Sequence, residues 1–134
     1  MKLIGTGILL ALFAAGSLAA SPAALVYIIS PTDGEVVSSP VTVRFGLKGM
    51  GVAPAGVDRP NTGHHHLLVD VVELPAPGSP IPADDRHIHF GGGQTETTLE
   101  LEPGEHTLQL IMGNQNHVPH DPPVVSERIT ITVK

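Results

Sequence analysis

The sequence predicts an all-β protein, an immunoglobulin-like antiparallel β-sandwich of about seven short strands. Three observations support this fold class. Apolar and polar residues alternate over several short runs, which is the period of a half-buried strand. Turn-forming residues separate these runs, and the 134-residue chain contains 13 Pro and 15 Gly. No segment keeps the 3.6-residue period of an amphipathic helix.

Each run of alternating residues is bounded by residues that favour turns. Ser30-Pro31-Thr32-Asp33-Gly34 ends the first run, and Pro103-Gly104 precedes a later one. The expected strands are residues 25–29, 41–47, 64–72, 86–90, 95–101, 106–112 and 124–133. Two segments between them, residues 49–63 and 113–123, are rich in Gly, Pro and polar residues and are expected to be long loops.

The first 20 residues have the pattern of a secretory signal peptide. Lys2 is followed by an uncharged apolar stretch, residues 3–18, and by the small residues Ala19 and Ala20. We expect cleavage after Ala19, and residues 24–134 to form a single β-sandwich domain in the periplasm or outside the cell. A retained membrane anchor is the alternative, but the apolar stretch is near the lower limit for crossing a bilayer.

Composition excludes several classes of function. The chain has 13 acidic and 7 basic residues, a formal net charge of −6, which argues against nucleic acid and anionic membrane surfaces as partners. We expect no membrane insertion after signal cleavage. The absence of Cys rules out thiolate metal sites, cysteine nucleophiles and a lipoprotein anchor.

Histidine is abundant, with eight residues in a chain that has three Phe, one Tyr and no Trp. Seven of them lie in three short groups, and six of these seven are the candidate metal ligands: His64, His66, His87, His89, His117 and His120. Residues two apart on a strand share a face, so His64 and His66 point one way and His65 the other. Neutral imidazole is the commonest nitrogen ligand of metals in proteins.

An immunoglobulin-like path of the chain predicts where these histidines lie. The loops 49–63 and 113–123 then fall at the same end of the sandwich, where His64 begins its strand. Strand 86–90 runs back toward this end, which brings His89 nearer than His87. His106 begins its strand at the opposite end and is expected to lie apart.

The expected cofactor is a transition metal ion, with copper favoured over zinc. Met50 and Met112 each lie beside a loop at the proposed end, and thioether ligands favour Cu(I). Methionine is also a common core residue, which is the alternative for both. The histidines have alternatives as well, namely polar pairing between loops or a pH-sensitive surface.

Three motifs resemble those of a known group of proteins. They are Gly63-His64-His65-His66-Leu67-Leu68-Val69-Asp70, His87-Ile88-His89-Phe90-Gly91-Gly92-Gly93-Gln94-Thr95-Glu96 and Pro103-Gly104-Glu105-His106-Thr107-Leu108-Gln109-Leu110. Together they resemble a bacterial family of small exported proteins classed as a domain of unknown function. The resemblance covers roughly residues 45–133 and implies no particular activity.

Two better-known groups are similar in part. Periplasmic copper carriers are exported immunoglobulin-like domains with His and Met ligands, but this chain lacks their ligand His at the mature N-terminus. Cupins have an H-x-H pair followed by Glu and a P-x-G turn. Here Glu73 is too far from His66, and Pro103-Gly104 lacks the intervening residue.

The sequence therefore predicts an exported, His-rich metal-binding module that stores or transfers copper or zinc in the cell envelope. Its partners are the metal ion and an envelope protein that exchanges it. The main alternative is a cupin-like metal-dependent enzyme in which Asp70 or Glu73 assists. A third interpretation is a structural or protein-binding module of the envelope that needs no metal.

Overall fold

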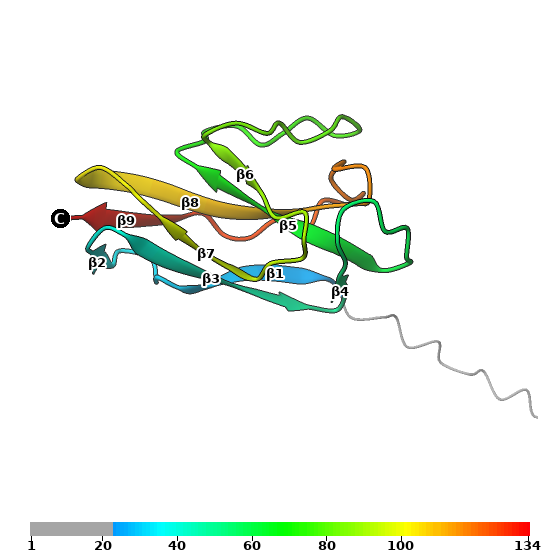
Figure 1. Cartoon of the computed structure of the whole chain (residues 1–134), viewed down its shortest axis with the longest axis horizontal. Coiled ribbons are helices and arrows are strands. Elements are labelled where there is room, and N and C mark those ends of the chain that lie inside the picture. The colour runs from blue at the N-terminus through cyan, green and yellow to red at the C-terminus, as the bar shows by residue number, and fades with distance from the viewer. Residues whose placement is uncertain (1–22) are drawn as a thin grey trace, which may run out of the picture.

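The computed structural model describes residues 23–134 as two packed β-sheets (Figure 1). The smaller sheet has the strand order β1-β3-β7, and the larger one has the order β2-β9-β8-β5-β4. A further strand, β6, pairs with the same edge of β5 as β4 does. The strands are β1 (Leu25–Ser30), β2 (Val36–Val37), β3 (Val41–Lys48), β4 (Gly51–Val52), β5 (Thr62–Val69), β6 (His87–His89), β7 (Glu96–Leu99), β8 (Gly104–Gly113) and β9 (Ile129–Val133).

This arrangement confirms the predicted fold class. A sheet of β1, β3 and β7 facing a sheet of β9, β8 and β5 is the division of strands found in immunoglobulin-like sandwiches. From residue 23 onward the chain forms strands, turns and loops and no helix. None of the described segments is a helix long and apolar enough to span a membrane. The predicted signal peptide, residues 1–20, lies outside the described residues.

The core between the sheets is built from alternate residues of the facing strands. Val43 and Phe45 on β3 meet Leu108 and Leu110 on β8, and all four are at most 4% exposed. Burying one such side chain contributes roughly 1.5–3 kcal/mol. The interior apolar positions therefore hold the sheets together in a chain that has no disulfide.

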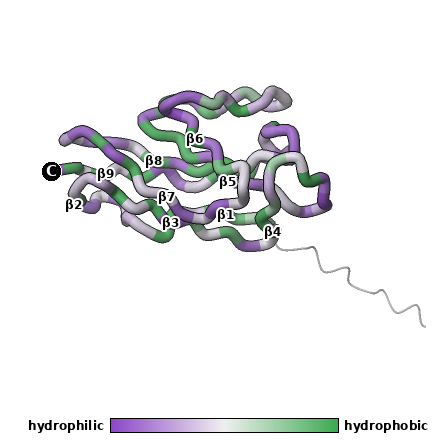
Figure 2. Tube along the Cα trace, in the orientation of Figure 1, coloured by the Kyte–Doolittle hydropathy of each residue, from purple (hydrophilic) through white to green (hydrophobic). Residues whose placement is uncertain are grey.

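The outer face of the larger sheet is also partly covered. Leu68 on β5 and Ile111 on β8 pack there against Ile81. Ile81 belongs to the long connection between β5 and β6, whose path can be followed in Figure 2. As a result every residue of β5 from Gly63 to Val69 is buried, on both faces of the sheet. A strand with both faces covered normally consists of apolar residues, yet three of these positions are histidines.

Strand β5 ends at Val69, three residues earlier than predicted, because Asp70 turns the chain. Asp70 has a φ of 54°, and its Oδ1 accepts a hydrogen bond from the backbone N–H of Thr107 at 2.8 Å. Its Oδ2 lies 2.8 Å from His106 Nδ1. The hydrogen bond to Asp70 raises the pKa of His106 above its ordinary value.

The last predicted strand is also shorter than expected. Residues 124–128 run beside β8 but do not form a regular ladder, because Ser126 turns its side chain into the sheet. The Ser126 hydroxyl accepts the N–H of Leu110 at 2.9 Å, while its own N–H donates to the Leu110 carbonyl. Regular pairing with β8 resumes only at Ile129.

The Asp70–His106 contact predicts a pH-dependent contribution to stability. The folded-state pKa of His106 is raised. The contribution of the Asp70–His106 contact to the free energy of unfolding is therefore fully present below pH 6.5 and is lost as the pH rises through that raised pKa. We expect His106→Gln to lower the free energy of unfolding more at pH 6 than at pH 9. The difference should be about 1 kcal/mol, since the pair is partly exposed. Urea denaturation at both pH values measures it, and equal losses at both would contradict the assignment.

Candidate metal centre

The centre begins with the alternation of side chains along β5. His64 and His66 point to the outer face of the larger sheet, and His65 points into the core, where its ring lies 5.1 Å from that of Phe45. His64 and His66 are 0% and 1% exposed. Their cross-strand neighbours are Gly113 on β8 and His89 on β6, respectively. The two buried imidazoles form the floor of the centre.

Two more histidines complete the group from neighbouring segments. His89 comes from β6, directly opposite His66 in the antiparallel ladder, and is exposed to solvent. His117 comes from the loop 113–123 and is half-buried. These two imidazoles form the rim of the centre, above the floor of His64 and His66.

The backbone at His117 is held in an unusual conformation. Its φ is 64°, in the left-handed region that non-glycine residues rarely adopt. Asn114 stabilises this turn, because its side-chain oxygen accepts the backbone N–H groups of Asn116 and Val118 and its carbonyl accepts that of His117. The His117 carbonyl in turn accepts the N–H of Ile81 at 2.8 Å. The position of His117 is therefore fixed by both neighbouring loops.

The four imidazoles converge closely. His64 Nε2 lies 3.1 Å from His66 Nε2 and 3.2 Å from His117 Nδ1. His64, His66, His89 and His117 each offer one ring nitrogen, and these nitrogens all lie within 4.8 Å of one another. The ring of His89 is centred 5.0 Å from those of both His64 and His66, and 4.6 Å from that of His117.

Hydrogen bonding between the rings does not account for this convergence. A neutral imidazole nitrogen either donates its one proton or accepts through its one lone pair. His64 Nε2 therefore makes an ordinary hydrogen bond to only one of the two nitrogens that it faces. A cation placed among the three nitrogens would instead accept a lone pair from each.

The spacing also fits metal coordination. Two imidazole ligands of one tetrahedral zinc ion, at 2.0–2.1 Å each, lie roughly 3.3 Å apart. Two nitrogen pairs, at 3.1 and 3.2 Å, are already close to that separation. Two ligands of one ion are at most about 4.2 Å apart, so a pair near the 4.8 Å bound needs only a small ring movement. The rings of His66 and His117 are the furthest apart, with centroids separated by 6.1 Å.

Two glycines leave room for the ligand rings. A Cβ atom on Gly113 would lie 2.8 Å from His66 Nε2, and one on Gly91 would lie 2.9 Å from His89 Nε2. Neither glycine has a positive φ that would require this residue type. Glycine is needed at both positions because the imidazoles occupy the space that any larger residue would fill.

Burial keeps these histidines neutral at physiological pH. Burial, followed by the charges of neighbouring histidines, lowers the pKa of His64 to about 4 and that of His66 to about 3. Burial and the charge of His117 lower the pKa of His89 as well. Neutral imidazoles have free lone pairs, so protons compete little with a metal ion at pH 7.

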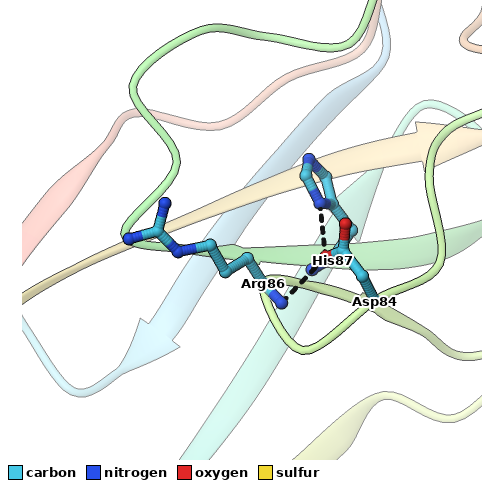
Figure 3. Close-up of polar contacts among 3 residues, drawn as sticks. All are labelled: Asp84, Arg86 and His87. Atoms are coloured by element: carbon cyan, nitrogen blue, oxygen red, sulfur yellow. Dashed lines mark hydrogen bonds and ion pairs between the residues drawn. The ribbon is translucent and has the colours of Figure 1, made fainter.

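The structure does not place His87 or His120 in this group. His87 Nδ1 lies 2.8 Å from Asp84 Oδ1, and this carboxylate also accepts the backbone N–H groups of Arg86 and His87 (Figure 3). His120 lies against Gly63, whose missing side chain would point to the inner face of β5. His106 pairs with Ile131 at the opposite end of β8 from Gly113.

The other candidate residues also lie away from the four histidines. Met112 is opposite His65 and buried in the main core, and Met50 packs against that same core. Asp70 is engaged with His106 and Thr107, and Glu73 is exposed in the loop after β5. Among residues 23–134, no Asp or Glu oxygen belongs to the four-histidine group.

Three residues that support the centre were not singled out from the sequence. Gly91 and Gly113 provide space, and Asn114 holds the turn at His117. A sequence signal exists in each case, because glycine follows His89-Phe90 and Gly113-Asn114 precedes His117 by a few residues. The contact of Gly113 with His66 is tertiary and leaves no local pattern, whereas Gly91 lies only two residues after the His89 ring that it accommodates.

The fold and the centre define a class of protein, an immunoglobulin-like β-sandwich with four converging histidines on the outer face of one sheet. Residues 43–134 match the model of a family described as a domain of unknown function, DUF4399. The chain belongs to this family, which confirms the resemblance carried by the three motifs. The match includes all four histidines of the group. No curated protein and no solved structure matches the chain.

The buried histidines predict instability in acid. His64, His65 and His66 have pKa values lowered to about 4, about 4 and about 3, with burial as the main cause. The unfolded chain takes up protons near pH 6.5 and the folded protein does not, so stability is lost as the pH falls from 6.5 toward 4. We expect His65→Leu to show a shallower loss over this range, in urea denaturation of metal-free protein at pH 7 and pH 5.

Carboxylates titrate alike in the wild-type protein and in His65→Leu. The comparison of the two therefore isolates the loss of stability that is due to the buried histidine. Neither ring nitrogen of His65 makes a hydrogen bond of ordinary geometry, and the nearby Gln94 backbone raises its pKa less than burial lowers it, so the substitution removes little polar interaction. Identical losses of stability between pH 7 and pH 5 in the two proteins would contradict the prediction.

Proposed function

We propose that this protein is a metal-binding module that binds one divalent transition metal ion through His64, His66, His89 and His117. The observation that carries the proposal is the convergence of three ring nitrogens, in which His64 Nε2 faces His66 Nε2 at 3.1 Å and His117 Nδ1 at 3.2 Å. Two of the three rings are buried and neutral. These imidazoles cannot all hydrogen-bond to one another, and their free lone pairs are suited to binding a cation.

The ligand set favours copper(II), then zinc. Imidazole suits both ions, and a given nitrogen site binds Cu²⁺ more tightly than Zn²⁺. The methionine sulfurs, which favour Cu(I), are not in this group, because Met112 lies on the inner face of the sheet with His65. The expected cargo of the four-histidine centre is therefore a divalent ion.

The geometry supports storage or transfer of the ion rather than catalysis. His89 is exposed at the rim, so a ligand of an acceptor protein can approach the ion from solvent. An enzyme would need a general base beside the ion, but Asp70 is held by His106 and Thr107, and Glu73 is exposed in the loop after β5. Action in the cell envelope rests on the predicted signal peptide of residues 1–20.

Titration of tag-free protein with Zn²⁺ and Cu²⁺ tests the proposal. We expect one ion per chain in wild type and no measurable binding in the His64→Ala/His66→Ala double variant, because both floor ligands are removed. His89→Ala should weaken binding by at least about tenfold, since a group that orients or supplies a ligand changes affinity by this order. Isothermal titration calorimetry in competition with a chelator gives the affinities.

His87→Ala is the matched control, because His87 lies on the same strand and the same face as His89 but outside the group. It should bind metal within about twofold of wild type, given that only ligands and their supports contribute strongly. Equal binding by wild type and the double variant would overturn the four-histidine centre, and a large loss in His87→Ala would show a different ligand set.

Gly113→Ala tests the centre without removing any ligand. The added Cβ would lie 2.8 Å from His66 Nε2 and 3.1 Å from its Cδ2, so the imidazole must move. We expect the affinity for Zn²⁺ to fall by about 10- to 100-fold, the usual effect of disturbing a ligand's orientation. Gly51→Ala is the control, since its Cβ would make only an ordinary contact of 3.5 Å with Thr62. Unchanged affinity in Gly113→Ala would place His66 outside the coordination sphere.

A further inference from the structure

A second group of metal-binding side chains lies on the opposite face of β5, at the same end of the sandwich. A Cβ on Gly63 would point to the inner face and would lie 2.6 Å from His120 Nε2 and 3.3 Å from Met50 Cε. The imidazole nitrogen of His120 and the terminal methyl group of Met50, which is bonded to its thioether sulfur, therefore both lie beside the same glycine. His64, the next residue, points to the outer face.

His120 offers an unused ligand atom at this point. Its Nε2 is buried and makes no hydrogen bond, and burial lowers the pKa of His120. A buried polar nitrogen without a partner needs an explanation, because leaving such a group unsatisfied costs roughly 1–3 kcal/mol. Binding a cation through the free lone pair would remove this penalty.

A cavity opens beside the pair. It has a volume of about 410 Å³, and both Met50 and His120 line it, together with Asn61, Pro122 and Val124. Asn61 donates its side-chain N–H to the Gly49 carbonyl, and its remaining oxygen is a hard donor that does not favour Cu(I). Met112 lies on the same face but in the main core and does not line the cavity. One imidazole and one thioether are therefore the soft or nitrogen ligands that line the cavity.

We propose that His120 and Met50 bind Cu(I) at a second site, separated from the four-histidine centre by β5. Thioether sulfur is a soft ligand that selects Cu(I), and imidazole binds copper in either oxidation state. The loop 113–123 supplies a ligand to each site, His117 to the outer one and His120 to the inner one. The two faces of one strand thus offer a nitrogen site for a divalent ion and a mixed sulfur–nitrogen site for Cu(I).

Anaerobic titration with Cu(I) against a chromophoric Cu(I) chelator tests this site. The wild-type protein is first saturated with Zn²⁺, which occupies nitrogen ligands and has little affinity for thioethers. We expect it to bind one Cu(I), and Met50→Leu to bind it at least tenfold more weakly. Leucine has nearly the volume of methionine, so this variant should fold. Met112→Leu is the matched control and should keep the wild-type affinity.

Copper K-edge absorption detects directly whether sulfur coordinates Cu(I). It therefore distinguishes a ligand role of Met50 from a purely structural one. Sulfur should be present in the first coordination shell of Cu(I) in wild type and Met112→Leu, and absent in Met50→Leu. A nitrogen-only shell in wild type, or equal Cu(I) affinity in wild type and Met50→Leu, overturns the proposal.

The outcome does not depend on the four-histidine centre. The same titration on the His64→Ala/His66→Ala variant should still give one Cu(I) with a sulfur ligand. His120→Ala should lose Cu(I), because it removes the imidazole ligand, whereas Gly51→Ala should keep it, since its Cβ would make only an ordinary contact with Thr62. Retention of Cu(I) by His120→Ala with unchanged affinity would also count against the site.

Discussion

The strict alternation of side chains along β5 is the constraint on which the rest of the molecule depends. Three consecutive histidines occupy a strand that is buried on both faces. The strand sends His64 and His66 outward and His65 into the core, so one short motif contributes to two different environments. The pairing of β5 with β8 and β6 then determines which residues stand opposite each histidine.

Burying these histidines opposes the stability of the fold. Both ring nitrogens of His65, and Nδ1 of His64 and His66, are buried without hydrogen-bond partners. Each such group lowers stability by an amount comparable to a lost hydrogen bond. Apolar residues would serve a two-sided strand better, so histidine at these positions indicates a role other than packing. On the outer face metal binding is a sufficient reason, but His65 lies away from the four-histidine group, and we have no physical account of it beyond its packing against Phe45.

Support for the four-histidine group comes from residues that bear no charge. Gly113 and Gly91 accommodate the rings of His66 and His89, and Asn114 stabilises the left-handed turn at His117. Ile81, from the loop that covers the outer face, donates its N–H to the His117 carbonyl. The floor of the group is thus a buried strand, and its rim is formed by the exposed His89 on β6 and by His117 in a braced loop.

The sequence by itself determined the fold class, most strands and the pairing of His64 with His66 on one face, because strand alternation and turn residues are local properties. It also indicated that His106 would lie apart from His64, since strand direction follows from the order of turns. The strand ends at Asp70 and Ser126 were not predictable, because they depend on contacts of these two side chains with the backbone of a distant strand, β8. Tertiary structure alone decided that His87 pairs with Asp84 while His89 joins the group, and that His117 and His120 lie on opposite faces of β5. Residues two or three apart in a loop follow no period, so only the packed fold decides which sheet face each of them reaches.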